Sequence, residues 1–327
     1  MLVIYSNAYL LHNNEEHPEN ASRLKAIVSY LKASPLNEKL DWQEPYEISE
    51  DEIAKVHSIE MIQNARHVGW LDMDTYTNEH SYSVAKLAAG GVVKACDEIL
   101  KGRHSQAFAL VRPPGHHATR NHSMGFCIFN NVAIAANWLT QRGKKVFIFD
   151  HDVHHGNGTQ DIFYDRSDVV YASIHLFPHY PGTGRIEEVG AGEGEGYTIN
   201  APLPHGSGEE CITALLNEIF IPVAEQFKPD FILISAGFDS HYGDPLGGLK
   251  LGIDFYGEII KKFMEVQKRI VCSLEGGYVA EVLAKGVAKE IATMLDFPLN
   301  YNDKGDGRQC NDVVESLKKK MASYWNI

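Results

Sequence analysis

Short runs of apolar, often β-branched residues alternate with amphipathic helical patterns along almost the whole chain. The apolar runs predict strands at residues 2–6, 107–111, 145–150, 169–175, 231–237 and 270–276. The patterns between them predict helices near residues 20–33, 80–101, 129–142, 209–227, 252–267 and 279–296. The apolar runs do not alternate with polar residues, so we expect strands buried on both faces. An α/β fold follows, with a mostly parallel central sheet and helices on both of its faces.

Nothing in the sequence divides the chain into parts. It has no internal repeat, no low-complexity segment and no linker rich in Pro, Gly or Ser. With 327 residues, 44% of them hydrophobic, the chain is long enough to bury a large core. We therefore expect one domain over residues 1–327. Its polar tail, from about 300 to 327, is expected to end in a helix.

The formal net charge of −13 disfavours a nucleic-acid partner, because binding a phosphate backbone needs a basic surface. An acidic surface attracts cations instead, such as lysine-containing peptides or polyamines.

The five scattered cysteines form no Cys-x-x-Cys pair, which predicts neither a disulfide framework nor a structural zinc knuckle and favours a reducing cytoplasm. The N-terminal "MLVIYSNAY" is typical of a strand rather than a signal peptide, and no apolar run is long enough for a membrane span. We expect a soluble, cytoplasmic protein without a membrane partner.

Titratable residues collect directly after the predicted strands. Nine of the sixteen histidines fall between residues 104 and 179, most of them just past a strand, as in "RPPGHHA" and "DHDVHHGNG". A single loop histidine is usually exposed or bonded to a carbonyl group, so no one of them is decisive. The carboxyl ends of parallel strands, however, form the ligand-binding edge of such a sheet. The repetition at several strand ends therefore predicts a functional site.

Two residues of "DHDVHHG" have the spacing of metal ligands. Asp152 and His154 are two positions apart in an extended segment, so their side chains point the same way. Asp239, after another strand, is the best-placed third ligand. Two carboxylates and one imidazole suit Zn²⁺, or Fe²⁺ or Co²⁺, and three protein ligands leave a position for water, as in catalytic sites.

The remaining groups suit hydrolysis of an amide. His116 and His117 are candidates for the general base and acid, and Asp150 and Asn157 for the partners that fix their tautomers. Tyr278, after two glycines in "EGGY", is a candidate donor to a developing oxyanion.

The motifs "HPENASRL", "RPPGHHA", "GFCIFNN", "DHDVHHGNGTQDIFY", "SIHLFPHYPGTG", "AGFDSHYGDPLGG" and "EGGY" occur in order. Together they resemble the histone deacetylase superfamily, including its prokaryotic amidohydrolases and acetylpolyamine amidohydrolases. The resemblance implies the arginase/deacetylase fold, one catalytic zinc ion and hydrolysis of N-acetyl groups. One departure is that "HPENASRL" lacks the Arg-Pro that follows HPE in many members.

The resemblance also implies roles for residues. The zinc ligands would be Asp152, His154 and Asp239. His117 would be the general base and acid, oriented by Asn157, and His116 would assist electrostatically, oriented by Asp150; Tyr278 would stabilise the oxyanion. A structural K⁺ would be bound by Asp150, Asp152, His154, Ser173 and Ile174. The acyl-lysine tunnel would be lined by Gly125, Phe126, Tyr180 and Leu246.

The substrate is expected to be an acetylated lysine of a protein or a related small amine, with acetylpolyamine as the alternative. Leu246 stands where a polyamine-specific relative carries Glu, and residues 70–90 lack the insertion that narrows the mouth of bacterial acetylpolyamine enzymes. Two other hypotheses remain. One is a ureohydrolase that binds two Mn²⁺ with Asp239 and Asp244, and the other is a catalytically silent acyl-binding module. A homo-oligomer is possible. His151 and His155 receive no role.

Overall fold

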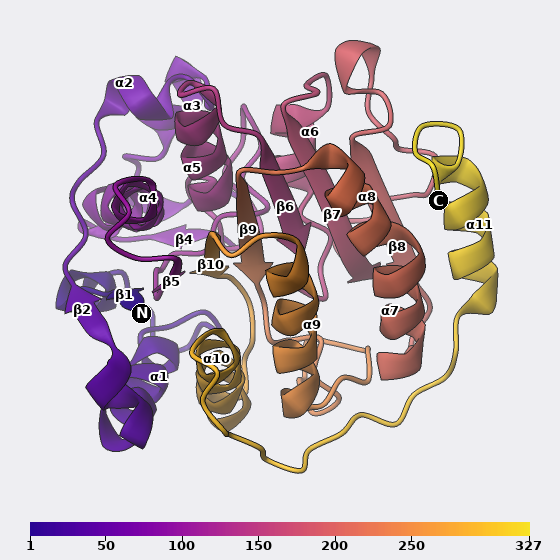
Figure 1. The fold of residues 1–327 in the computed structure, drawn as a ribbon. Coiled ribbons are helices and arrows are strands. Elements are labelled where there is room, and N and C mark those ends of the chain that lie inside the picture. Colours follow the sequence, from indigo (N-terminus) through magenta and orange to yellow (C-terminus); the bar gives the residue numbers. More distant parts are fainter.

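The computed structural model describes residues 1–327 and is built around an eight-stranded sheet. The strand order is β2-β1-β5-β10-β9-β6-β7-β8, and every neighbouring pair is parallel (Figure 1). The strands are β1 (Leu2–Ile4), β2 (Asp41–Gln43), β5 (Gln106–Ala109), β6 (Val146–Asp150), β7 (Val169–Leu176), β8 (Thr198–Leu203), β9 (Phe231–Ala236) and β10 (Ile270–Leu274). A separate antiparallel hairpin consists of β3 (Gly69–Trp70) and β4 (Tyr76–Thr77).

Helices cover both faces of this sheet. On one face, α1 (Ser22–Ala33), α10 (Ala280–Met294), α9 (Ile253–Val266) and the pair α7 (Glu209–Leu215) and α8 (Ile221–Phe227) follow one another in a row (Figure 1). The other face carries α4 (Ser81–Leu100), α5 (Asn131–Thr140) and α6 (Asn157–Phe163). The short helices α2 (Glu50–Ile53) and α3 (Ile59–Asn64) lie between β2 and the hairpin in the sequence. The predicted single α/β domain with a parallel sheet is confirmed.

The central strands are buried because helices cover them on both sides. Every residue of β6, β7, β9 and β10 is buried, and a single cluster of 92 buried hydrophobic residues runs through the domain. Strands in this position need apolar side chains on both faces, which explains the unbroken apolar runs in the sequence.

The structure contains all six predicted strands and adds two at the sheet edges. β2 is only three residues long, and β8 contains Pro202. A proline removes a ladder hydrogen bond and is tolerated at an edge, so neither segment has the pattern of a central strand. The helix predicted at 209–227 is interrupted by a π-helical turn, Leu216–Phe220, just before Pro222.

The C-terminal tail returns to the edge of the sheet and is joined covalently to helix α7. Helix α11 (Asn311–Met321) lies beyond the β8 edge, with Leu317 and Met321 in the main core (Figure 1). Just before this helix, Cys310 forms a disulfide with Cys211, 99 residues away. The expectation that the scattered cysteines form no disulfide was wrong for this pair, because their proximity depends on where the tail docks. Cys96, Cys127 and Cys272 are free and buried.

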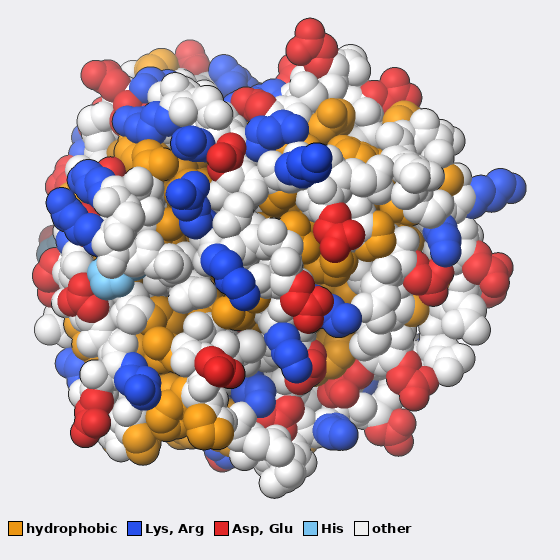
Figure 2. Space-filling model, in the orientation of Figure 1, with side chains coloured by type: hydrophobic (Ala, Val, Ile, Leu, Met, Phe, Trp, Pro, Cys, Tyr) orange, Lys and Arg blue, Asp and Glu red, His pale blue; other side chains and the backbone are white.

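The face of the molecule shown in Figure 2 carries basic and acidic side chains intermingled, without a continuous basic patch. None of the helices is both long enough and apolar enough to cross a membrane.

Candidate metal centre and active-site pocket

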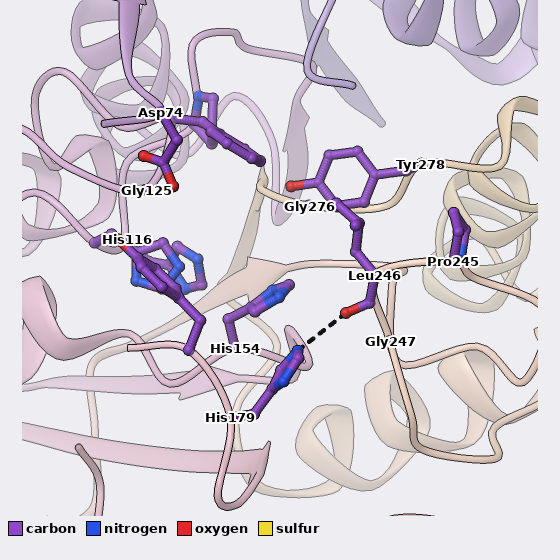
Figure 3. Close-up of a pocket in the computed structure, with 14 residues that line it drawn as sticks. Asp74, His116, Gly125, His154, His179, Pro245, Leu246, Gly247, Gly276 and Tyr278 are labelled. Atoms are coloured by element: carbon purple, nitrogen blue, oxygen red, sulfur yellow. Dashed lines mark hydrogen bonds between the residues drawn. The ribbon is translucent and has the colours of Figure 1, made fainter. Parts of the chain in front are cut away.

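A pocket of about 330 Å³ opens at the carboxyl end of the sheet. Its walls include the catalytic candidates His116, His117, His154 and Tyr278. Figure 3 shows the labelled side chains of His116, His154 and Tyr278 around one central space. The four residues expected to line the tunnel, Gly125, Phe126, Tyr180 and Leu246, also belong to this wall. The loops after β5, β6, β7, β9 and β10 thus contribute to one cavity, as the distribution of histidines predicts.

The three metal-ligand candidates converge on one point. The Nδ1 atom of His154 lies 3.0 Å from Oδ1 of Asp152 and 3.3 Å from Oδ2 of Asp239. Both carboxylates are held by backbone groups through a second contact: Asp152 Oδ2 accepts from the N–H of Gly276, and Asp239 Oδ1 accepts from that of Val153. One oxygen of each carboxylate is therefore fixed while the other faces His154.

Glycine is required beside these carboxylates. A Cβ atom at Gly276 would lie 2.1 Å from Asp239 Oδ2, and one at Gly237 would lie 2.0 Å from Asp152 Oδ2. No side chain fits at these distances. The glycines of "EGGY" and "AGFDS" thus let the backbone approach the ligand carboxylates closely.

These ligands fit a divalent cation. Asp239 Oδ2 is fully buried and has no hydrogen-bond partner, which is costly for a carboxylate oxygen unless a cation binds it. Burial lowers the pKa of His154, but its hydrogen bond to Asp152, its 3.3 Å contact with Asp239 and the charges of both carboxylates outweigh burial and raise the pKa to about 10. The site therefore attracts positive charge, and a Zn²⁺ ion bound by these atoms would replace that proton.

The two adjacent histidines have different partners and opposite pKa shifts. His116 Nδ1 lies 3.0 Å from the carboxylate of Asp150, while His117 Nδ1 lies 2.8 Å from Oδ1 of Asn157. Burial lowers the pKa of His116, but the charges of Asp150 and Asp152 raise it to about 10. The pKa of His117 falls well below its usual value through burial and the neighbouring charges of His116 and His154. These shifts favour a cationic His116 beside a neutral His117, a separation typical of acid and base pairs.

Tyr278 presents a hydroxyl group to the pocket (Figure 3). Its backbone N–H donates to Asp244 Oδ2 at 2.7 Å, which fixes the start of the segment that follows "EGG". Burial, together with the nearby charge of Asp239, raises the pKa of Tyr278 well above its usual value. The hydroxyl therefore keeps its proton at neutral pH and acts as a hydrogen-bond donor.

Comparison with known proteins identifies the family. A sequence model described as the histone deacetylase domain matches residues 17–294. The chain belongs to the histone deacetylase family. Two archaeal proteins named "Probable deacetylase" are similar over nearly their whole length. The one from Methanothermobacter thermautotrophicus is 43% identical over 100% of both chains, and the one from Archaeoglobus fulgidus is 39% identical over 99% of this chain and 98% of its own.

Plant members of the histone deacetylase family are also similar. "Histone deacetylase 14, chloroplastic" of Arabidopsis thaliana is 38% identical over 90% of this chain and 76% of its own. The crystal structure of the HDA15 HD domain superposes with a TM-score of 0.92 at 34% identity, covering 99% of this chain and 96% of that one. Membership of the histone deacetylase family supports a hydrolase of the deacetylase type.

Three further residues hold the active-site loops of this family member in place. Arg23 donates to the carbonyl oxygens of Gly277 and Glu275, and its guanidinium lies 5.3 Å from the ring centre of Tyr278. The buried carboxylate of Glu275 accepts from the backbone N–H groups of Gly115 and His116 at 2.7 and 3.2 Å. The third is Asp244, which accepts from the backbone N–H of Tyr278. The sequence motifs contain all three residues, but they do not reveal these contacts, because the backbone groups bound at the site lie far along the chain from Arg23, Glu275 and Asp244.

Of the residues expected at a potassium site, only His154 belongs to the pocket wall. Ser173 is opposite Asp150 in the β6–β7 register, and Ile174 follows it; both are buried. The Ser173 hydroxyl is 2.9 Å from Nδ1 of His175.

The two unassigned histidines of "DHDVHHG" are buried and point away from the pocket. His151 contacts the carbonyl oxygen of Gly237 through Nδ1 and the carboxylate of Glu290 through Nε2, each at 2.9 Å. His155 contacts Thr183 at 2.7 Å and Gln160 at 3.1 Å. His151 therefore joins the segment of Asp152 to the one that leads to Asp239.

A second metal position is not supported by the surroundings. Both oxygens of Asp244 accept backbone N–H groups, from Leu246 and Tyr278, so this carboxylate is committed to the turn. His116, Cys127 and Glu275 also lie close together, but burial raises the pKa of the Cys127 thiol well above its usual value. A metal ligand there would need the thiolate, which this burial disfavours.

Proposed function

We propose that the protein is a zinc-dependent deacetylase that hydrolyses N-acetyl amides, with acetyl-lysine side chains of proteins or related small amines as substrates. One observation carries the proposal: a buried ligand set with an unpartnered carboxylate oxygen shares a pocket with a cationic–neutral histidine pair and a tyrosine hydroxyl. These are the parts of metal-assisted amide hydrolysis.

Asp152, His154 and Asp239 would hold the metal ion. Zn²⁺ bound there would supply Lewis-acid activation of the amide carbonyl and of the attacking water; Fe²⁺ or Co²⁺ suits the same ligands. The family membership and the local attraction for positive charge support this choice. The implied K⁺ would be held by Asp150, Asp152, His154, Ser173 and Ile174.

The residues of the chain would then move one proton. His117 is neutral, and its Nδ1–H donates to Asn157, which leaves Nε2 free to accept a proton from the attacking water. His116 stays cationic because it is paired with Asp150, and its positive charge would stabilise the negative charge that develops in the pocket. Tyr278 would donate its hydroxyl hydrogen bond to the oxyanion, and His117 would pass the proton to the departing amine.

The pocket walls suit a neutral acylated side chain. Gly125, Phe126, Tyr180 and Leu246 contribute no charge to the wall. Asp74 is the one carboxylate in the pocket lining and would attract a second ammonium group. An acetylpolyamine is therefore the second candidate substrate.

The test uses the whole chain after removal of metal with a chelator. Zn²⁺, Fe²⁺ or Co²⁺ is added back, and kcat/KM is measured on an acetyl-lysine peptide, acetylputrescine and acetylspermidine. We expect activity to return at one metal ion per chain, with the highest kcat/KM on acetyl-lysine. Two tightly bound Mn²⁺ per chain would support a ureohydrolase instead, and no hydrolysis with Zn²⁺ restored would support an acyl-binding module.

A further inference from the structure

A second pocket, of about 320 Å³, opens next to the active-site pocket. We call it the side pocket; its walls are Met61, Asn64, His67, Trp70, Leu71 and residues 121–123. These residues come from α3, from the β3–β4 hairpin and from the loop that leads to Gly125. None of them takes part in the proposed chemistry.

The side pocket and the active-site pocket share two walls. The hairpin contributes Trp70 and Leu71 to the side pocket and Asp74 to the active-site pocket. The loop at 121–126 likewise contributes its first part to the side pocket and its last two residues, Gly125 and Phe126, to the active-site pocket. The two pockets are therefore neighbours on either side of one ridge.

The ridge between the pockets is a defined structure. Met124 and Cys127 exchange backbone hydrogen bonds of 3.1 and 3.0 Å around Gly125 and Phe126, whose φ angles of 58° and 68° are left-handed. This tight turn is tied to the hairpin because the N–H of Phe126 donates to Thr75 Oγ1 at 3.1 Å. The ridge is therefore held in one position between the two pockets.

The chemistry of the side pocket suits a neutral segment of polypeptide. Its lining contains no Asp, Glu, Lys or Arg. The indole of Trp70 is 54% exposed and offers a surface for stacking. The side-chain amides of Asn64 and Asn121, exposed beside it, make no hydrogen bond within the chain, so they are free to bind main-chain groups.

We infer that the side pocket binds a residue that flanks the acetyl-lysine of a polypeptide substrate, with preference for an aromatic or large apolar side chain. This inference rests on the proposed function. A polyamine chain, which is cationic beyond its acetyl group, finds no carboxylate to pair with in the side pocket. In an extended peptide, residues near the acetyl-lysine reach past the ridge while its side chain enters the active-site pocket.

The experiment compares one minimal substrate, Nε-acetyl-lysine, with short peptides in which acetyl-lysine is flanked by Phe, Ala or Glu. The variants are Trp70→Ala and the conservative Trp70→Phe. The control is Tyr46→Ala, which removes another partly exposed aromatic group, in this case from a position that lines neither pocket. Oligomeric state is measured for each variant by light scattering.

For the parent protein we expect kcat/KM to be higher on the Phe peptide than on the Ala and Glu peptides. Trp70→Ala should lower kcat/KM on the Phe peptide about tenfold through KM, consistent with about 1–1.5 kcal/mol for one aromatic contact, and Trp70→Phe should restore most of it. Hydrolysis of Nε-acetyl-lysine should stay within about twofold for all variants.

The inference would be overturned if Trp70→Ala lowered kcat/KM equally on Nε-acetyl-lysine and on the peptides. It would also be overturned if kcat/KM of the parent protein were the same on the Phe, Ala and Glu peptides. A parent dimer that dissociates in Trp70→Ala would do the same, assigning the side pocket to a second copy of the chain. Failure of the parent on every acetylated substrate would refute the proposed function instead.

Discussion

Two buried clusters of charged side chains lie close together in this fold, and they are satisfied in different ways. In the first, Glu19 binds Arg112 through two contacts of 2.7 Å, from Nε and Nη2, and a third contact of 3.0 Å comes from Arg23. In the second, Asp152 and Asp239 face the single imidazole of His154, and one oxygen of Asp239 has no hydrogen-bond partner.

The difference distinguishes a structural cluster from a ligand site. Guanidinium groups supply several fixed donors, so the carboxylate of Glu19 is fully paired without any added ion. The charges of Arg112 and Arg23 outweigh burial and lower the pKa of Glu19 to about 2. The Asp152–His154–Asp239 cluster has more acceptors than donors and is therefore suited to a cation. Burial and charge alone do not mark a functional site; an unmatched set of ligand atoms does.

The comparison predicts the largest effect for Asp239→Ala. This variant should lose stoichiometric zinc and, with it, activity by roughly 10³-fold or more, because the metal contributes several kcal/mol to the transition state. Elemental analysis and kcat on acetyl-lysine measure both quantities. Asp230→Ala is the matched control, since Asp230 directly precedes β9 at its other end. An Asp239→Ala protein with full zinc content would contradict the assigned ligand set.

Tyr278→Phe should have the next largest effect. It removes one hydroxyl donor without changing the metal ligands, so kcat should fall by about 10²–10³ while the zinc content stays at one per chain. The control is Tyr242→Phe, which removes a surface hydroxyl bonded to Asp303. An unchanged kcat would take Tyr278 out of the mechanism.

The metal-ligand candidates could be recognised from the sequence for a chemical reason. Asp152, His154 and Asp239 are polar residues that follow apolar runs at strand ends, and such runs are recognisable in one sequence. The supporting contacts are not, because Arg23 and Glu275 bind backbone groups of segments far along the chain. The role of His151 depends in the same way on Glu290, which α10 brings to it.

The same limit applies to the fold. The buried central strands were predicted, since their apolar pattern is set by burial on both faces. The edge strands β2 and β8 were missed, because only contact with a neighbouring strand defines them. The disulfide of Cys211 and Cys310 depends on the docking of the tail.

Mutation of the structural cluster, which consists of Glu19, Arg112 and Arg23, should change the free energy of unfolding and leave the zinc content unchanged. Arg112→Met leaves the buried carboxylate of Glu19 with Arg23 as its one remaining arginine partner. It should therefore lower the free energy of unfolding by about 3–5 kcal/mol. Denaturant unfolding measures this change, and elemental analysis should still find one zinc ion per chain. In the control, Lys318→Met breaks an ion pair with Glu218 that is 43% exposed on both sides and should cost no more than about 1 kcal/mol. Loss of zinc in Arg112→Met would show that the clusters depend on each other, with Arg23 as their link.

The smallest effect we predict is the acid dependence that Glu19 confers. Its pKa is lowered from 4.5 to about 2 in the folded protein, so folding stabilises the ionised form. That stabilisation is fully present above about pH 4.5 and is lost as the pH falls toward 2, by about 3 kcal/mol in total. The free energy of unfolding, measured by denaturant titration between pH 5 and pH 2, should fall less steeply for Glu19→Gln than for the parent protein, because the variant has no proton to bind at this position. Equal slopes would show that Glu19 does not form an ion pair with Arg112 in the folded state. The contrast between a paired cluster and one suited to a cation would then lose its basis.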